Sequence, residues 1–481
     1  MKKILKTFCS LSLTFGLFAG CADIDSENSK RNNSENLTRK EELAFYALSN
    51  NYILTESEME SNLRDFLTID TVKSRSAQEK SDFELIQSAK DVIKIEDNYN
   101  ISRSASISSY DDVNLYMYKL NNKKTGKEGF AITSTDRRIG NIIAVIPEGT
   151  LEDNNSPFIE MFLDNLQDYV DETVDIWNEL DDDYLNDFSG THDIGRSTES
   201  NIVTSGNFSY KNWKFNSGNI NNFIKVNWGQ DSPYNDVICT EKGKYYYTGC
   251  GPTALAQLLS NIEFPKTCSV EGYKNIRYDW PAMKKNSHIY SLDANTRKMI
   301  ATLMYELGLG LNASYSVDGT GCYNSDITSY LSKNNYYYSG FDDYNLSGVK
   351  NSIDAGYPVL CQGYAFDTVT KTKIRKKIFG ITYKTTTKIN HNYSSGHYWI
   401  VDGYANLTCS AVNKNTSAET TLKADFVHCN LGWSGSCNGY YLNGVFDTNH
   451  LPTSTINGRA STSGESYFYQ YNLKMLTKLH H

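Results

Sequence analysis

Tyr247-Thr248-Gly249-Cys250-Gly251-Pro252-Thr253-Ala254-Leu255-Ala256-Gln257-Leu258-Leu259 is the stretch that decides how this 481-residue chain is interpreted. Its leucines, followed by Ile262, recur at helical spacing and predict a helix from Pro252 to Phe264 with one buried face. Gly249 and Gly251 permit a tight turn into that helix, and a proline suits its first turn. The stretch therefore places Cys250 at the start of a buried helix.

Cys250 is the candidate nucleophile. A thiol at a helix N-terminus lies near the positive end of the helix dipole and near unpaired N–H groups, and both favour the thiolate. A buried structural cysteine is the alternative, and the local context argues against it. A cysteine nucleophile also needs a base, which protonates the leaving amine.

His397 is the candidate base, because it directly precedes an apolar strand, Tyr398-Trp399-Ile400-Val401, that ends in a turn at Gly403. His391 and His428 are rivals, and His288 is a more distant one. His391 lies in a polar loop, and His428 is interpreted as a packed strand residue. The other histidines considered are in the linker or at the chain end: His192, His480 and His481.

Two amides complete a possible acyl-transfer site. Gln230 lies in a loop 20 residues before Cys250, where its side chain and the Cys250 N–H would form an oxyanion hole. Asn430 follows His428-Cys429 and is suited to orient an imidazole, with Trp433 beside it as a shield. The order Gln, Cys, His, Asn along the chain is stronger evidence for an acyl-transfer site than any one of these residues alone.

These segments resemble the streptopain family of bacterial cysteine peptidases. The resemblance covers residues 221–475 and implies a papain-like domain of α+β class, with a helical part and an antiparallel sheet or barrel, behind a smaller α+β inhibitory propeptide. It implies that Cys250, His397, Asn430 and Gln230 are catalytic. It also places four residues at the substrate cleft or its shield: Trp433, Gly396, Gly249 and Trp399.

The chain departs from the family pattern in two places. Leu431 stands where the family usually has the first Trp of Asn-Trp-Gly-Trp-Gly-Gly, which puts the shield over the His–Asn bond in doubt. Gly251-Pro252 replaces bulkier residues that often follow the nucleophile.

The N-terminus resembles a bacterial lipoprotein signal. Met1-Lys2-Lys3 is followed by a short apolar run that ends at Gly20-Cys21. The run is too short to span a membrane as a mature helix. We expect an exported protein, lipid-anchored at Cys21 on the outer membrane or cell surface, or secreted after processing. A plain secretory signal is the alternative.

Hydrophobic patterning divides the rest of the chain. We expect a signal peptide over 1–21, a disordered tether over 22–40, a propeptide over 41–190, a linker with the activation cut over 191–216 and a catalytic domain over 217–478. The acidic run Asp181-Asp182-Asp183 is assigned to solvated linker. Three basic residues are candidate positions for activation cleavage: Arg196, Lys211 and Lys214.

The amino-acid composition narrows the classes of partner that this chain is expected to bind. A formal net charge of −9 with scattered Lys and Arg disfavours nucleic acid. Cysteine spacing indicates no structural zinc, and no metal or organic cofactor is expected. The expected partners are protein or peptide substrates and the chain's own propeptide as an intramolecular inhibitor. Two other functions stay open, a catalytically silent binding lipoprotein and an amidase acting on a non-peptide amide.

Overall fold

The computed structural model describes residues 37–49, 51–68, 83–94, 114–123, 126–149, 157–192, 208–238, 245–285, 289–316, 319–378, 381–415, 417–446 and 471–481. The predicted signal peptide with its lipidation site, most of the tether and the candidate cleavage residue Arg196 lie outside these ranges. No helix within them has the length and apolar character needed to cross a membrane.

Helices occur in both halves of the described chain. They are α1 (Arg39–Ser49), α2 (Glu56–Leu67), α3 (Pro157–Asn178), α4 (Asp182–His192), α5 (Cys250–Ile262), α6 (Trp280–Met283), α7 (Ala294–Gly310), α8 (Asn324–Lys333) and α9 (Leu346–Asp354), with the 3-10 turns η4 (Ile289–Ser291) and η5 (Asn443–Val445).

The strands are β1 (Phe83–Lys94), β2 (Asn114–Asn122), β3 (Glu128–Ser134), β4 (Ile142–Ile146), β5 (Phe208–Tyr210), β6 (Lys214–Asn219), β7 (Ser314–Tyr315), β8 (Thr320–Gly321), β9 (Phe341–Asp343), β10 (Val359–Ile378), β11 (Ile381–Asn413), β12 (Glu419–Asn430), β13 (Gly439–Leu442) and β14 (Tyr471–Leu476).

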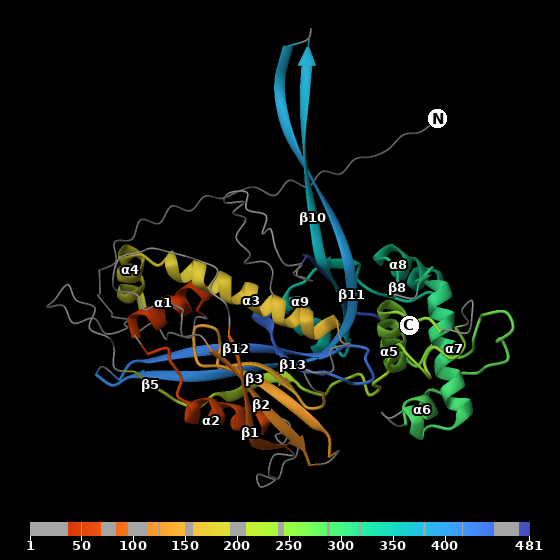
Figure 1. The fold of residues 1–481 in the computed structure, drawn as a ribbon, viewed down its shortest axis with the longest axis horizontal. Coiled ribbons are helices and arrows are strands. Elements are labelled where there is room, and N and C mark those ends of the chain that lie inside the picture. Colours follow the sequence, from red (N-terminus) through yellow and green to blue (C-terminus); the bar gives the residue numbers. More distant parts are fainter. Residues whose placement is uncertain are drawn as a thin grey trace, which may run out of the picture. The chain divides into compact units, whose positions relative to one another are not determined.

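One antiparallel sheet runs through both halves. Within the described residues its order is β1-β2-β3-β4-β13-β12-β11-β10-β14-β9, with β5 and β6 pairing onto β11. The N-terminal strands join the C-terminal ones where Val145 pairs with Tyr440 and Ala144 with Tyr441. The far part of the β10–β11 hairpin runs away from the other elements (Figure 1).

Strand β11 separates two apolar clusters. Trp399 and Val401 pack in the cluster that includes the N-terminal strands and helices, whereas Tyr398 and Ile400 pack in the cluster built on α5, α7 and α8. This alternation follows from the two-residue period of a strand. Figure 1 shows α5, α6, α7 and α8 grouped together, away from α1 to α4. The predicted α+β class, a helical part beside an antiparallel sheet, is confirmed.

The helix predicted from Pro252 to Phe264 forms as α5, shifted by two residues, but part of the expected linker is structured. The acidic run begins α4, where Asp181 accepts a hydrogen bond from the Tyr184 N–H at 2.7 Å. Carboxylates at a helix N-terminus complement its dipole. Two candidate cleavage residues, Lys211 and Lys214, lie in or beside strands that pair with β11.

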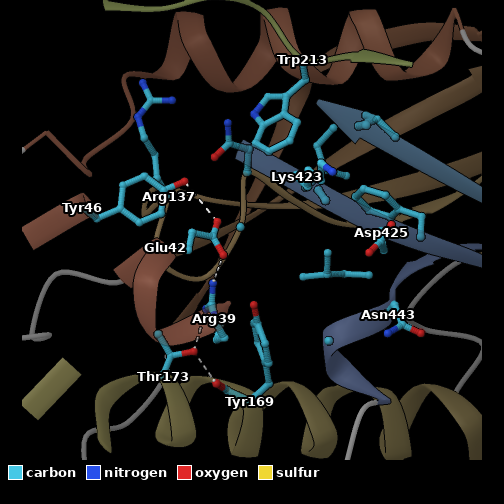
Figure 2. A pocket seen from close by; sticks show the side chains of 18 of the residues that line it. Arg39, Glu42, Tyr46, Arg137, Tyr169, Thr173, Trp213, Lys423, Asp425 and Asn443 are labelled. Atoms are coloured by element: carbon cyan, nitrogen blue, oxygen red, sulfur yellow. Dashed lines mark hydrogen bonds and ion pairs between the residues drawn. The ribbon is translucent and has the colours of Figure 1, made fainter. Parts of the chain in front are cut away.

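A cavity of about 190 Å³ lies where the N-terminal helices meet β12. Figure 2 shows Arg39 and Glu42 of α1 facing Tyr169 and Thr173 of α3 across it. Arg39 donates to Glu42 at 2.9 Å and to Thr173 at 3.0 Å. These bonds tie α1 to α3. The cavity lies between the N-terminal helices and the C-terminal strands, and none of the predicted catalytic residues lines it.

Candidate active site

Cys250 is the first residue of α5, as the sequence predicted. Gly249 precedes it with φ +94°, a conformation that favours glycine, and a Cβ there would lie 2.9 Å from the Thr320 carbonyl oxygen. The thiol is half-buried. Burial raises the pKa of Cys250, while backbone N–H groups of Tyr398, Gly251 and Cys250 itself act in the opposite direction.

The main chain at His397 passes close to the nucleophile, because Tyr398, whose backbone hydrogen-bonds Cys250, is the next residue of β11. The imidazole is almost fully buried, and it stacks parallel to Trp399 with ring centroids 6.3 Å apart. Burial lowers the pKa of His397 to about 4, and a hydrogen bond to the backbone of Leu431 partly offsets this. Burial therefore disfavours the charged form of both groups.

The rival histidines lie elsewhere. His428 on β12 bonds through Nδ1 to the buried carboxylate of Asp402, at 2.5 Å. The other oxygen of Asp402 accepts from the Ile224 N–H at 3.0 Å, so this pair ties β12 to the segment before the nucleophile. His391 is farther out along β11, opposite Val369. His288 lies outside the described residues.

Gln230 is held next to the nucleophile turn, because its carbonyl accepts from the Thr248 N–H at 2.9 Å. Its side chain is only 4% exposed, yet Nε2 has no hydrogen-bond partner among the described residues. A buried donor left unpaired costs about 1–3 kcal/mol, so it calls for an explanation. A donor that is unpaired until it binds an oxyanion during the reaction is such an explanation.

Asn430 ends β12 and is buried. Its Nδ2 donates to the Val226 carbonyl at 3.1 Å, and its Oδ1 accepts from Gln257 at 3.1 Å and from the Gly432 N–H at 3.2 Å. Both amide atoms thus have partners other than the imidazole. The hydrogen bond to His397 comes from the backbone of the next residue, Leu431, and the bonds of Asn430 hold this segment in place.

Two of the predicted cleft residues, Trp433 and Gly396, have defined neighbours. Trp433 is half-buried and meets Tyr247 edge to face, with ring centroids 6.4 Å apart. The Ser434 N–H donates to the Trp228 carbonyl at 3.3 Å, which joins this loop to the Gln230 segment. Gly396 is exposed, and a Cβ there would lie 3.0 Å from the Tyr364 ring.

Gln257 is a site residue whose role the sequence did not reveal. It is fully buried on α5, its Oε1 accepts from the Trp228 N–H at 3.0 Å, and its Nε2 donates to Asn430. One side chain thereby connects the nucleophile helix, the Gln230 segment and the Asn430 segment. A polar residue among the alanines and leucines of a buried helix was the available signal.

Residues 228–441 match the Peptidase C10 family. This segment is similar to Peptidase C10 domains. It contains all of the predicted catalytic residues, and the match confirms the predicted relationship to streptopain-type cysteine peptidases.

Individual relatives are distant. The chain is 23% identical over 255 residues to thiol protease/hemagglutinin PrtT of Porphyromonas gingivalis, covering 50% of this chain and 25% of that protein. It is 21% identical over 365 residues to streptopain of Streptococcus pyogenes, covering 68% of this chain and 73% of that protein. The chain thus spans about a quarter of the first relative and about three quarters of the second.

Two solved structures from Prevotella intermedia are also similar. A prointerpain A fragment matches with a TM-score of 0.44 and 18% identity, covering 81% of this chain and 98% of that one. Active interpain A cysteine protease matches with a TM-score of 0.34 and 20% identity, covering 55% of this chain and 95% of that one.

Proposed function

We propose that this chain is a cysteine endopeptidase zymogen that hydrolyses protein substrates through a thioester acyl-enzyme. Cys250 attacks the scissile carbonyl, and His397 carries the proton to the leaving amine. Gln230 and the Cys250 N–H hold the oxyanion. The unpartnered, buried amide of Gln230 beside the turn that carries Cys250 is the observation that supports this chemistry most directly.

The N-terminal part, residues 41–190, is proposed as the inhibitory propeptide. Pro147 and Glu148, just after β4, line a cavity together with His428 and Asn430. The Glu148 carbonyl accepts from the Cys437 N–H at 3.1 Å. The N-terminal part thereby docks on the loop that follows Asn430.

Activation is proposed to occur by cleavage between α4 and β5, at residues 193–207. This range contains Arg196, whereas Lys211 and Lys214 are tied to β11. Removal of the N-terminal part would hydrate the cleft, and hydration favours the thiolate–imidazolium pair over the neutral pair.

The test is mass spectrometry with a casein assay on the reduced full chain, with and without trypsin. Wild type is expected to lose its N-terminal part and digest casein, and Cys250→Ala to do neither unaided. Cys361→Ala, which alters a buried cysteine on β10, is the matched control and should behave as wild type. If trypsin releases a stable C-terminal domain that digests nothing, the binding-protein alternative replaces this proposal.

Export is proposed on the sequence of residues 1–21 alone. Cys21 would carry the lipid anchor. Cys21→Ala should move the protein from the membrane fraction to the soluble fraction. An unchanged distribution would leave only a plain secretory signal.

A further inference from the structure

Two thiols in the described chain differ from the rest in their exposure. Cys250 and Cys322 are half-buried, whereas the other free cysteines there are buried: Cys268, Cys361, Cys409, Cys429 and Cys437. Reactivity toward oxidants requires access to solvent as well as thiolate character. Among the cysteines that the structure describes, the candidate nucleophile and Cys322 are therefore the most accessible to a dissolved oxidant.

Cys322 lies against the nucleophile turn. A Cβ built on Gly251 would be only 2.3 Å from the Cys322 sulfur, and one on Gly249 would be 2.9 Å from the Thr320 carbonyl oxygen. Thr320 also donates its hydroxyl to the Tyr247 carbonyl at 2.7 Å. Residues 320–322 thus run along the turn on both sides of Cys250.

This packing accounts for an unusual feature of the sequence. Gly251 stands where the streptopain family often has a bulkier residue, and the space beside its Cα is occupied by the thiol of Cys322. Burial raises the pKa of Cys322, and repulsion from the Cys250 sulfur, when that sulfur is a thiolate, raises it further. A Cys250 sulfenic acid is uncharged, so this repulsion is absent after the first oxidation step.

We propose that Cys322 is the resolving thiol of the active site, which forms a reversible disulfide with Cys250 after Cys250 is oxidised by a peroxide. The proposal rests on the assignment of Cys250 as the nucleophile. In the first step the Cys250 thiolate attacks peroxide, an S–O bond forms and the O–O bond breaks. Sulfur loses two electrons to the peroxide. With hydrogen peroxide, one OH group is transferred to sulfur and the other leaves as hydroxide.

In the second step the Cys322 sulfur attacks the Cys250 sulfenic acid. An S–S bond forms, the S–OH bond breaks, and the Cys322 proton leaves with the hydroxyl group as water. The disulfide removes the nucleophile, and it protects that sulfur from further oxidation to sulfinic acid. An added thiol, such as dithiothreitol, would restore both cysteines.

The experiment treats the reduced full chain with hydrogen peroxide, blocks remaining thiols and maps peptides by mass spectrometry without reduction. Wild type is expected to give a cross-linked peptide pair containing residues 250 and 322. Cys322→Ser should give none and should accumulate sulfinic acid at Cys250. Cys361→Ser is the control and should cross-link as wild type, and thermal unfolding checks that each variant folds.

Activity after trypsin activation is a separate measurement. After peroxide, dithiothreitol should restore casein digestion in wild type but not in Cys322→Ser. Sulfinic acid forming equally in both proteins, without a cross-link, would overturn the proposal. A cross-link in a protein that digests no casein even when reduced would instead refute the proposed peptidase function, because the peptide map does not depend on activity.

Discussion

Replacing Gln257 is the sharpest test of how this site is assembled. Gln257→Leu keeps approximately the same volume but removes the acceptor of the Trp228 N–H and one of the two donors to Asn430 Oδ1. The Trp228 N–H then has no acceptor in a buried site, at a cost of about 1–3 kcal/mol, and losing one of two donors at Asn430 costs about 1 kcal/mol. The free energy of unfolding should fall by about 2–4 kcal/mol.

Catalysis should fall as well, because Gln257 connects the segments that carry Gln230 and the Leu431 contact to His397. We expect kcat for casein peptides to fall about 10- to 100-fold with a smaller change in KM, as misplacement of a catalytic group does. Urea unfolding measures the first effect, and steady-state kinetics of the trypsin-activated enzyme measures the second.

Ser260→Ala is the matched control on the same helix. Ser260 is buried and donates to the Gln257 carbonyl at 2.6 Å, so its loss should cost about 1 kcal/mol of stability and leave kcat unchanged. If Gln257→Leu loses stability but keeps the kcat of Ser260→Ala, then the connection stabilises the fold without aligning the site, and the reasoning fails.

Three further predictions concern single residues. Gln230→Ala should lower kcat by about 10²–10³-fold without loss of stability, since its donor has no partner to lose; a lower melting temperature with normal kcat would contradict this. The pKa of His397 is about 4 in the folded protein and 6.5 in the unfolded chain, so the unfolded chain binds the proton more readily. The free energy of unfolding is therefore highest above pH 6.5 and falls by about 3 kcal/mol as the pH is lowered from 6.5 to 4. His397→Gln should flatten that part of a urea-unfolding series against pH, and an unchanged slope would exclude this origin. Gly251→Ala should cost about 1–3 kcal/mol by crowding the Cys322 sulfur, and Cys322→Gly should restore the loss in the double variant; additive losses in the thermal-unfolding cycle would show that the two positions do not interact.

Most of the prediction of the candidate site rests on local patterns in the sequence. Cys250 begins α5, as the local pattern predicted. His397 was expected at the start of a strand, but it lies inside β11, which begins at Ile381 and pairs with β10.

The partners of Asn430 were not predicted, since the imidazole it was expected to hold is bonded by the main chain of Leu431 instead. Two partners of the Asn430 amide, Val226 and Gln257, are distant in sequence and could not be read from the local pattern.

The linker shows the same limit in its secondary structure. Phe208 and Trp213 lie, with Tyr210 and Phe215, in a stretch that is otherwise polar, and composition alone predicts a solvated connection. Both are buried, in and beside the short strands that pair with β11. Pairing with an existing strand supplies the backbone partners that local propensity does not indicate.

The joint between β4 and β13 has a consequence for the released enzyme. Loss of the N-terminal part would turn β13 into an outer strand, with main-chain groups of Tyr440 and Tyr441 open to solvent. Such an edge can recruit other chains, but four residues make a poor template, and short edges are a common protection against aggregation. Because β13 is short, the protein could lose a third of its sheet without exposing an edge that promotes aggregation.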